Sequence, residues 1–328
     1  MQDELDDQFI VDLRSEQEKL KKERVRLSDQ RREYNKILAH DARMDQLYDD
    51  LCAAAQRMTP FQFVPLKKDT SSCELVIFVN DVHYGMRTDN PFNEYNPQIC
   101  EMRFQRYSER AINYIKKFEP KKVHIAVLGD MIHGCIHSEC RVVANESTVD
   151  QLMRVSELLA QFIGSIRVCG VEVDVHCTYG NHARTQQDKR ESQHSDNLEK
   201  LIPFWLKQRF NKVHGVNIVD NELDGFIHFN IFGWGFIATH GDLEKPETYG
   251  MTMRSLFAKR GWDIDYAIMA DKHHYEAKDM VGIETVICPA MCGVDDYANN
   301  HRLYSSPAQL MMVVTETGGA EGRFNIRF

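Results

Sequence analysis

The stretch VIFVNDVHYG, Val76 to Gly85, is where the fold and the chemistry of this chain meet. Its apolar start, through Asn80, predicts a buried β-strand. The strand runs directly into Asp81, and His83 follows two residues later. A turn would explain such punctuation at a strand end. A metal site would explain a carboxylate and an imidazole two positions apart, and the stretch alone leaves both interpretations open.

Four further predicted strands end in residue types that bind metals. The segments are IAVLGDMIH with Asp130 and His133, TYGNH with Asn181 and His182, FIATHGD with His240, and YAIMADKHHY with Asp271, His273 and His274. In an open α/β sheet, ligands gather beyond the carboxyl ends of the strands. We therefore expect these side chains to converge, with Gly129, Gly180 and Gly241 allowing close backbone turns.

The types of side chain at these strand ends indicate which ions they would bind. Carboxylate, imidazole and amide groups without thiolate suit Mn²⁺, Fe or Zn²⁺ rather than a cysteine-rich structural zinc. There are too many of them for one tetrahedral ion. Two divalent cations sharing a carboxylate, about 3.5–4 Å apart, form the site that many enzymes use for phosphoryl displacement. The pattern predicts such a pair.

The order of elements predicts an α/β fold. Strands alternate with helices through the first half of the region after residue 73, and beyond Val216 the sequence is rich in strands. This order favours two sheets packed together with helices outside. The predicted domains are a helical extension over 1–58, a linker over 59–72 and one domain over 73–328.

The N-terminal segment has its own pattern. From Gln8 to Met58 there is no Gly and no Pro. Leucine or tyrosine recurs every seven residues, and a companion set is only partly apolar; the two sets are Leu13, Leu20, Leu27 and Tyr34, and Ile10, Gln17, Arg24, Arg31 and Leu38. One apolar row beside a partly apolar row is compatible with a coiled coil, through which residues 8–58 would self-associate or bind a protein partner. It is also compatible with a single solvated helix held by charge pairs.

Composition limits the location and the partners. No apolar run approaches the roughly 20 residues that span a bilayer, and the start, MQDELDDQ, is acidic where a signal peptide would be basic and then apolar. We expect a cytoplasmic protein with no membrane partner. The net charge of −9 implies no large basic surface for duplex nucleic acid, and no interleaving of aromatic and basic residues marks a single-strand track.

The five motifs DVH, GDMIH, GNH, THG and ADKHH, in this order after strands, resemble those of the calcineurin-like, or binuclear, metallophosphoesterases. The resemblance covers Leu75 to the C-terminus. It implies a four-layer α/β/β/α sandwich of two mixed sheets. It also implies two divalent metal ions, with Mn²⁺ favoured and Fe, Zn²⁺ or Mg²⁺ possible.

The resemblance implies a role for each matched residue. Asp81 and His83 would bind one metal, Asn181 and His240 the other, and Asp130 would bridge them. His182 would act beside the substrate as general acid or transition-state stabiliser.

The last motif departs from the family pattern G-H-x-H. In the favoured alignment Asp271 replaces the first histidine and His273 keeps the second; a shift of one residue would instead make His274 the ligand. An aspartate in that place adds negative charge, which favours Mn²⁺ over Zn²⁺.

Two more residues are expected near a bound phosphate, together with Asn181. His133 lies three residues after Asp130, and Arg184 lies two after His182. Arginine suits bidentate phosphate recognition, although Arg184 could equally form a surface ion pair.

Three functions remain open at this point. The GDMIH and GNHAR forms look most like the nuclease-like branch, which includes the Mre11/SbcD exonucleases, and like calcineurin-like phosphoesterases of bacteriophages and prophages. That resemblance implies a phosphodiesterase or nuclease on DNA or nucleotides, in a bacterial or phage-infected host cell. The alternatives are a phosphomonoesterase acting on a small molecule or phosphoprotein, and a catalytically weak scaffold that works through the N-terminal helix.

Overall fold

The computed structural model divides the chain into two units, Met1–Ala54 and Ala55–Phe328. It describes residues 2–59, 61, 65–66, 71–134, 136, 146–186, 188 and 192–328, and only the backbone of residues 2–15, 40 and 297. Part of the predicted linker, 59–72, lies outside the described residues. No helix among them is both long and apolar enough to cross a membrane.

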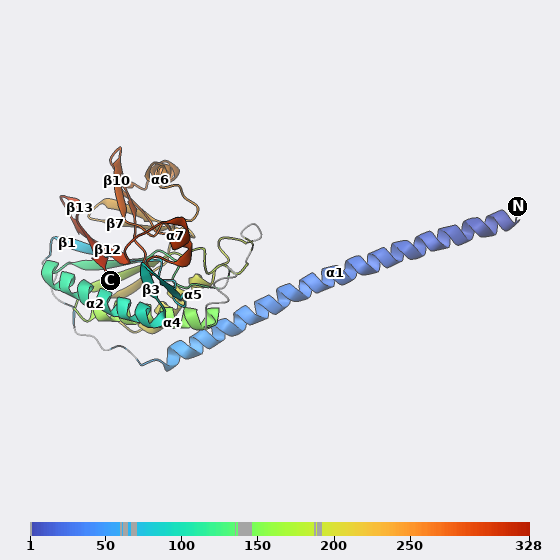
Figure 1. Ribbon diagram of the computed structural model, residues 1–328, viewed down its shortest axis with the longest axis horizontal. Coiled ribbons are helices and arrows are strands. Elements are labelled where there is room, and N and C mark those ends of the chain that lie inside the picture. The colour runs from blue at the N-terminus through green and yellow to red at the C-terminus, as the bar shows by residue number, and fades with distance from the viewer. Residues whose placement is uncertain are drawn as a thin grey trace. The chain divides into compact units, whose positions relative to one another are not determined.

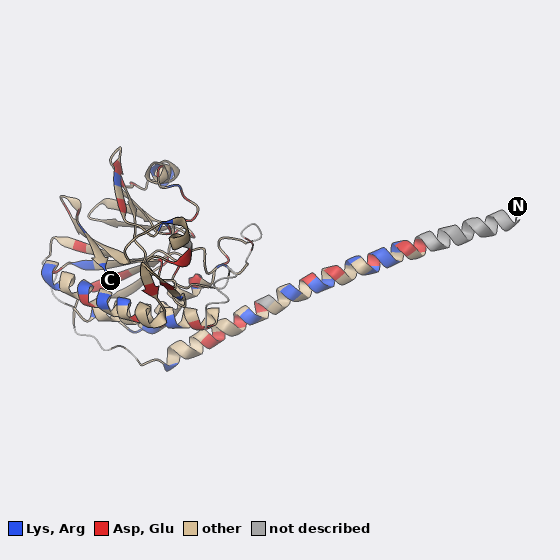
Figure 2. Ribbon diagram, in the orientation of Figure 1, with Lys and Arg blue, Asp and Glu red and all other residues tan. Residues whose placement is uncertain are grey.

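The N-terminal helix predicted from the sequence is present as α1 (Gln2–Arg57). Lys and Arg alternate with Asp and Glu along the part of α1 whose side chains are described (Figure 2). Apolar side chains of the seven-residue pattern are more than half exposed, at 58% for Leu20, 59% for Leu27 and 61% for Tyr34. Charge pairs such as Lys36–Glu33, at 2.7 Å, support the helix locally.

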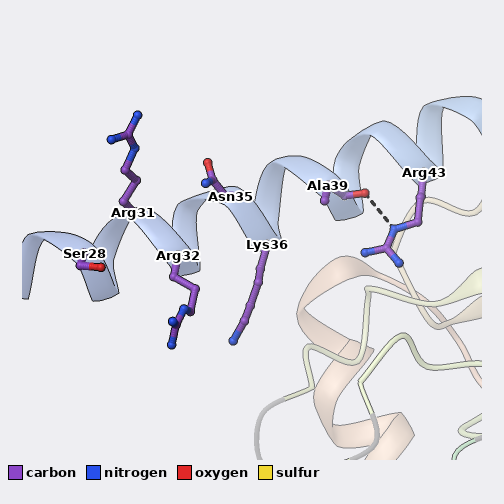
Figure 3. A pocket seen from close by; sticks show the side chains of 7 residues that line it. All are labelled: Ser28, Arg31, Arg32, Asn35, Lys36, Ala39 and Arg43. Carbon is purple, nitrogen blue, oxygen red and sulfur yellow. Dashed lines mark hydrogen bonds between the residues drawn. The ribbon is translucent and has the colours of Figure 1, made fainter.

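A hollow runs along α1 and contains no feature of a binding site. It is lined by Ser28, Arg31, Arg32, Asn35, Lys36, Ala39 and Arg43 (Figure 3). All seven residues come from this one helix, and its one drawn hydrogen bond runs from Arg43 Nε to the Ala39 carbonyl, one turn away. A ligand site needs walls from more than one direction, so we assign the hollow no function.

The larger unit is built on two mixed β-sheets (Figure 1). The first has the order β13-β12-β1-β4-β5-β6. Its strands are β1 (Cys73–Val79), β4 (Lys122–Val127), β5 (Glu172–Cys177), β6 (Val216–Val219), β12 (Ala308–Thr315) and β13 (Gly319–Arg327). Strands β1, β4, β5 and β6 are parallel, and β12 and β13 continue the sheet antiparallel. The parallel strands therefore end at one edge.

The second sheet has the order β10-β11-β9-β8-β7. Its strands are β7 (Ile227–Ile231), β8 (Trp234–Ala238), β9 (Tyr266–Met269), β10 (Glu276–Met280) and β11 (Ile283–Ile287). Here β8, β9 and β11 are parallel, and β7 and β10 run antiparallel at the two edges. A separate hairpin joins β2 (Thr88–Asn90) to β3 (Asn93–Tyr95).

The two sheets face each other across a shared apolar core. Val76 and Phe78 of β1 meet Phe236 of β8, Ile268 of β9 and Val286 of β11 in one buried cluster. Every residue of β1 is buried, as expected for a strand covered on both faces. The sheets and the helices outside them confirm the predicted class: an α/β/β/α sandwich of two mixed sheets.

Helices cover the outer faces of both sheets. They are α2 (Pro97–Phe118), α4 (Thr148–Arg167) and α5 (Leu201–Phe210) outside the first sheet, and α6 (Tyr249–Phe257) outside the second. Short helical turns η1 (Leu198–Lys200) and η2 (Ala258–Arg260) adjoin α5 and α6, and α7 (Asp296–His301) follows β11. Helix α2 begins where Asn96 accepts the backbone N–H of Ile99, with Pro97 in its first turn.

A polar stack is buried between the sheets. His124 of β4 lies 2.8 Å from Glu74 through Nε2 and 3.3 Å from His176 of β5 through Nδ1. Both histidine rings stack on Phe229. Burial, and next the charge of His124, lower the pKa of His176 to about 3. These two histidines lie inside strands and pack between the sheets, so we assign them a structural role.

The low pKa of His176 predicts a loss of stability in acid. Since histidine titrates near 6.5 in an unfolded chain, the unfolded state binds more protons between pH 6.5 and pH 3, and the free energy of unfolding falls as the pH decreases through this window. We expect His176→Gln to remove about 2 kcal/mol of the loss between pH 7.5 and pH 5. Urea unfolding of wild type and variant at several pH values, with a chelator present to remove bound metal, measures this loss. Identical dependence of the free energy of unfolding on pH in the two proteins would contradict the low pKa of His176.

Candidate metal centre

The strand ends bring the predicted residues to one place. Asp81 follows β1, Asp130 follows β4 and Asn181 follows β5 in the first sheet, while His240 follows β8 and Asp271 follows β9 in the second. Hydrogen bonds connect the two edges. His240 Nδ1 lies 2.9 Å from the Leu128 carbonyl, and the Asp271 amide donates to Asp81 Oδ2 at 3.3 Å. One crevice therefore takes residues from both sheets.

Two glycines let the strand-end turns of β4 and β5 touch. A Cβ on Gly129, which has φ of +91°, would lie 2.2 Å from the Gly180 amide nitrogen. A Cβ on Gly180 would lie 2.0 Å from Asp130 Oδ1. No side chain fits in either place, so the GD and GNH motifs need glycine for close approach.

Strained backbone is concentrated in the same residues. Five non-glycine site residues have left-handed φ values, namely Asp81 (47°), His83 (45°), Asp130 (51°), Asp271 (61°) and His273 (59°). This conformation is uncommon outside glycine and persists where surrounding structure imposes it. The left-handed backbone directs these side chains into the crevice, and each such residue costs about 1–3 kcal/mol of conformational energy.

Asp130 lies at the centre of the cluster. Its Oδ2 is 3.3 Å from His240 Nε2, 3.7 Å from His83 Nε2 and 4.0 Å from His182 Nε2. Its Oδ1 accepts the backbone N–H of His182 at 2.9 Å. One carboxylate thus faces imidazoles from three different strand ends, as a bridging ligand would.

The remaining residues form two neighbouring groups. On one side, His273 Nε2 lies 3.4 Å from His83 Nε2 and 3.5 Å from Asp81 Oδ1. On the other, Asp271 Oδ1 lies 3.6 Å from His240 Nε2. Side-chain donors of Asp81, Asp130 and His240 also lie within 4.8 Å of one another.

Backbone carbonyls orient two of the imidazoles. The Leu128 carbonyl accepts from Nδ1–H of His240, which leaves Nε2 of that ring for the crevice. The His133 carbonyl, at 3.0 Å, does the same for Nδ1 of His182. The His182 side chain is 18% exposed, against 3% for Asp130. The His182 ring is therefore more open to solvent than the Asp130 carboxylate.

Glu199, which the sequence did not single out, fixes the Asp130 turn. Its carboxylate accepts backbone N–H groups from Asp130 at 3.1 Å, Met131 at 2.6 Å and Gly180 at 2.9 Å. Burial, and next the charge of Asp130, raise the pKa of Glu199 to about 7. Its motif, DNLEK, resembles any helix start, so no local signal predicted this role.

The electrostatics of the crevice favour a cation. Burial would raise the pKa of Asp130, but the charges of His240 and His182 outweigh it and hold the pKa well below its usual range. Burial would lower the pKa of His240, yet Asp130, Asp81 and Asp271 raise it well above the usual range. The field that favours a proton on His240 would equally favour a metal ion beside it.

The structure separates the two alignments of the last motif. Asp271 and His273 both face the cluster, whereas the His274 side chain is 47% exposed and lies 3.5 Å from Glu276. Lys272 turns its ammonium to Asp271 Oδ2 at 2.7 Å. This geometry favours the alignment in which Asp271 and His273 are ligands; their binding of metal stays a prediction.

A thiol also reaches the crevice, although the sequence analysis described its ligands as free of thiolate. Cys292 lies beyond β11, and its Sγ is 4.0 Å from His273 Nδ1. Side-chain donors of His83, His273 and Cys292 form one of the candidate metal-binding groups. Since β11 is parallel to β9, its end lies at the same edge of the sheet. This position depends on how β11 pairs in the sheet, so no local signal in the sequence indicated Cys292.

The two predicted substrate residues differ in their surroundings. The His133 ring lies 5.9 Å from the His83 ring and 5.7 Å from that of His182, and the three side chains form a candidate metal-binding group. Arg184 lies beside the cluster, but its guanidinium donates to the carbonyls of Asn181 and Gln186. Phosphate binding by either residue stays a prediction.

Buried polar atoms in the crevice fit a pair of cations. Among the described residues, Asp81 Oδ1, Asn181 Oδ1 and His240 Nε2 are buried and have no hydrogen-bond partner. Unpaired buried polar atoms are costly unless something binds them. Oxygen and nitrogen donors of this kind suit Mn²⁺, Fe or Zn²⁺. The clusters are therefore candidate metal sites, and the identity of the metal is left open by them.

Comparison with known proteins yields likeness in fold. No protein-family model and no curated protein matches the sequence. One similar solved structure is a novel archaeal phosphodiesterase, with 12% identity, a TM-score of 0.40 and coverage of 77% of this chain and 99% of that one. Another is zinc-bound Vps29 from Entamoeba histolytica, with 12% identity, a TM-score of 0.37 and coverage of 77% and 98%. A predicted phosphoesterase from Streptococcus pneumoniae has 11% identity, a TM-score of 0.30 and coverage of 78% and 99%. Scores this low carry no argument about activity, so the chemistry must be argued from the side chains.

The neighbouring histidines of the last motif offer a matched pair of variants. We expect His273→Ala to lower the metal content or metal affinity of the purified protein, because its Nε2 faces Asp81 and His83. His274→Ala should leave both unchanged, since that ring lies outside the cluster. Titration with Mn²⁺ followed by metal analysis measures the difference; a loss in His274→Ala alone would show that the shifted alignment is correct.

Proposed function

We propose that this chain is a member of the calcineurin-like metallophosphoesterases and hydrolyses phosphodiesters of DNA or nucleotides with two divalent metal ions. The observation that carries the proposal is the central position of Asp130. Its buried carboxylate faces His83, His182 and His240, and Asp81 Oδ1, Asn181 Oδ1 and His240 Nε2 are buried without a hydrogen-bond partner. A site of this composition suits metal-assisted displacement at phosphorus.

The two groups around Asp130 define the proposed ligands. Asp81, His83 and His273 would hold one cation, and Asn181, His240 and Asp271 the other, with Asp130 shared. Cations bound there would supply an activated water and offset negative charge on the phosphate oxygens. Mn²⁺ is favoured because Asp271 adds a hard, charged oxygen donor.

His182 would protonate the leaving oxygen or stabilise the transition state. Its amide is tied to Asp130 and its Nδ1 to the His133 carbonyl, so the ring is held with Nε2 toward the crevice. Its side chain is 18% exposed, which is more than for the proposed ligands Asp81, His83 and Asp130 and about the same as for Asp271 and His273. A positioned acid of this kind contributes about 10²–10⁴-fold to rate.

Two other functions predict different behaviour. A phosphomonoesterase would use the same cations and prefer p-nitrophenyl phosphate. A scaffold would hold fewer than two ions and hydrolyse nothing. The strain and burial concentrated in the crevice favour an enzyme, because such local costs collect at functional sites.

The proposed activity is tested with Mn²⁺ and a panel containing bis-p-nitrophenyl phosphate, p-nitrophenyl phosphate, a cyclic nucleotide and single- and double-stranded DNA. We expect diesters and DNA to be cleaved faster than the monoester. His182→Gln should lower kcat by about 10²-fold or more, while the metal content stays at the wild-type level. Asp130→Asn should lose both metal and activity. Preference for the monoester, or two bound ions with no turnover, would refute the phosphodiesterase.

We also propose that α1 associates with a second copy of this chain. Its support is the row of exposed apolar side chains at seven-residue spacing, Leu20, Leu27 and Tyr34. Burying such a row between helices removes apolar surface from water, at about 25 cal/mol per Å², and matches the seam of a coiled coil.

A charge placed in this row should disrupt the association. We expect the full chain to be a dimer or larger by light scattering, and the double variant Leu20→Glu with Leu27→Glu to be monomeric. Val25→Glu is the matched control, because Val25 is equally exposed, at 56%, but lies off the row. A monomeric wild-type chain would contradict self-association and leave binding of a different protein as the use of α1.

A further inference from the structure

Two exposed aromatic side chains touch each other beside the candidate metal centre. Phe92 lies in the turn of the β2–β3 hairpin, and Tyr304 follows α7. Their ring centroids are 4.4 Å apart with an interplanar angle of 43°. The residues are 58% and 51% exposed, and neighbouring Leu303 is 59% exposed. Single exposed apolar residues are ordinary. Two exposed rings from distant segments that contact each other instead form a continuous aromatic surface.

The structure holds Phe92 firmly in this place. Asn90 Oδ1 accepts the backbone N–H groups of Phe92 and Asn93, both at 3.0 Å, which fixes the turn. Asn93 Nδ2 donates at 2.9 Å to the carbonyl of Cys292, the residue whose thiol lies near His273. The hairpin is therefore fastened to the loop that borders the metal centre.

Tyr304 is connected to the metal centre by one residue. Its neighbour Ser305 donates a hydrogen bond from Oγ to the His273 carbonyl at 2.5 Å. Consecutive Cα atoms are about 3.8 Å apart. The Cα of Tyr304 therefore lies about that far from the Cα of Ser305, which contacts the proposed ligand His273. Both aromatic residues thus lie next to a residue that hydrogen-bonds the backbone of the site, Asn93 to Cys292 and Ser305 to His273.

We propose that Phe92 and Tyr304 stack on a nucleobase of the substrate while the adjoining phosphate lies at the metal centre. This inference rests on the proposed phosphodiesterase function and names its substrate class as single-stranded nucleic acid or a nucleotide ester. Every base has a flat π-face, and stacking on an aromatic side chain contributes about 1–3 kcal/mol per base without sequence preference. Such a surface also reconciles nucleic-acid binding with a net charge of −9.

No pattern in the sequence predicted this surface, since the two rings lie in segments more than two hundred positions apart. No interleaving of aromatic and basic residues in the sequence marks such a surface. The fold creates the pair by fastening the β2–β3 hairpin to the segment that leads into α7, through Asn90 to the Val294 carbonyl and Thr88 to Asp296.

The test measures binding and turnover separately. Binding of a fluorescein-labelled thymidine octanucleotide is followed by anisotropy with Ca²⁺ present. We expect Phe92→Ala and Tyr304→Ala each to weaken it about tenfold, and Tyr304→Phe to retain wild-type binding. Leu256→Ala is the control, because Leu256 is 55% exposed on α6, apart from this surface.

Turnover with Mn²⁺ then compares a diester with a base to one without. The KM for the p-nitrophenyl ester of thymidine 5′-monophosphate should rise about tenfold in both alanine variants, while methyl p-nitrophenyl phosphate is hydrolysed as by wild type. Octanucleotide binding that is absent, or that both alanine variants keep, would overturn the stacking site. If wild type hydrolyses no diester yet binds the octanucleotide through these rings, the phosphodiesterase fails and the stacking site stands.

Discussion

The site depends on the contact between two strand-end turns. The turn after β4 carries Asp130 and the turn after β5 carries Asn181 and His182, and glycines let their backbones touch. Asp130 Oδ1 accepts the His182 amide, and Glu199 binds amides from both turns. Because these bonds are buried, each is hard to replace once lost. They fix the one carboxylate that faces His83, His182 and His240.

That fixed carboxylate creates an electrostatic problem for the folded chain. Asp81, Asp130 and Glu199 are almost fully buried, and Asp271 adds a further negative group. Asp81 and Asp130 belong to one candidate metal-binding group, and Glu199 accepts the Asp130 amide. Isolated buried charges are costly, so they need partners of opposite sign. His240 supplies part of the compensation, as its raised pKa beside Asp130 shows. Divalent cations would supply the rest.

Much of the fold could be predicted from the sequence because its signals are local. Apolar runs ending in Asp or His marked β1, β4, β8 and β9, and apolar spacing marked α4. Short elements gave no such signal: β10 has a mostly exposed surface, and β2, β3 and α7 are held by side-chain bonds such as Thr88 to Asp296. Nothing local distinguishes them from loops.

The residues of the candidate site likewise fall into those that the sequence could place and those that it could not. Asp81, Asp130 and Asn181 could be placed together because the parallel strands β1, β4 and β5 end at one edge of the same sheet. Glu199, Cys292 and the Phe92–Tyr304 pair could not, since their roles come from contacts between segments that only the folded chain brings together. The domain boundaries, the metal roles of the site residues and the substrate remain predictions.

The most direct test is anomalous X-ray scattering from a crystal of this protein grown with Mn²⁺. Two strong peaks about 3.5–4 Å apart, both within bonding distance of the Asp130 carboxylate, are the result that this account predicts. One peak, or peaks that leave Asp130 without a metal contact, would contradict it.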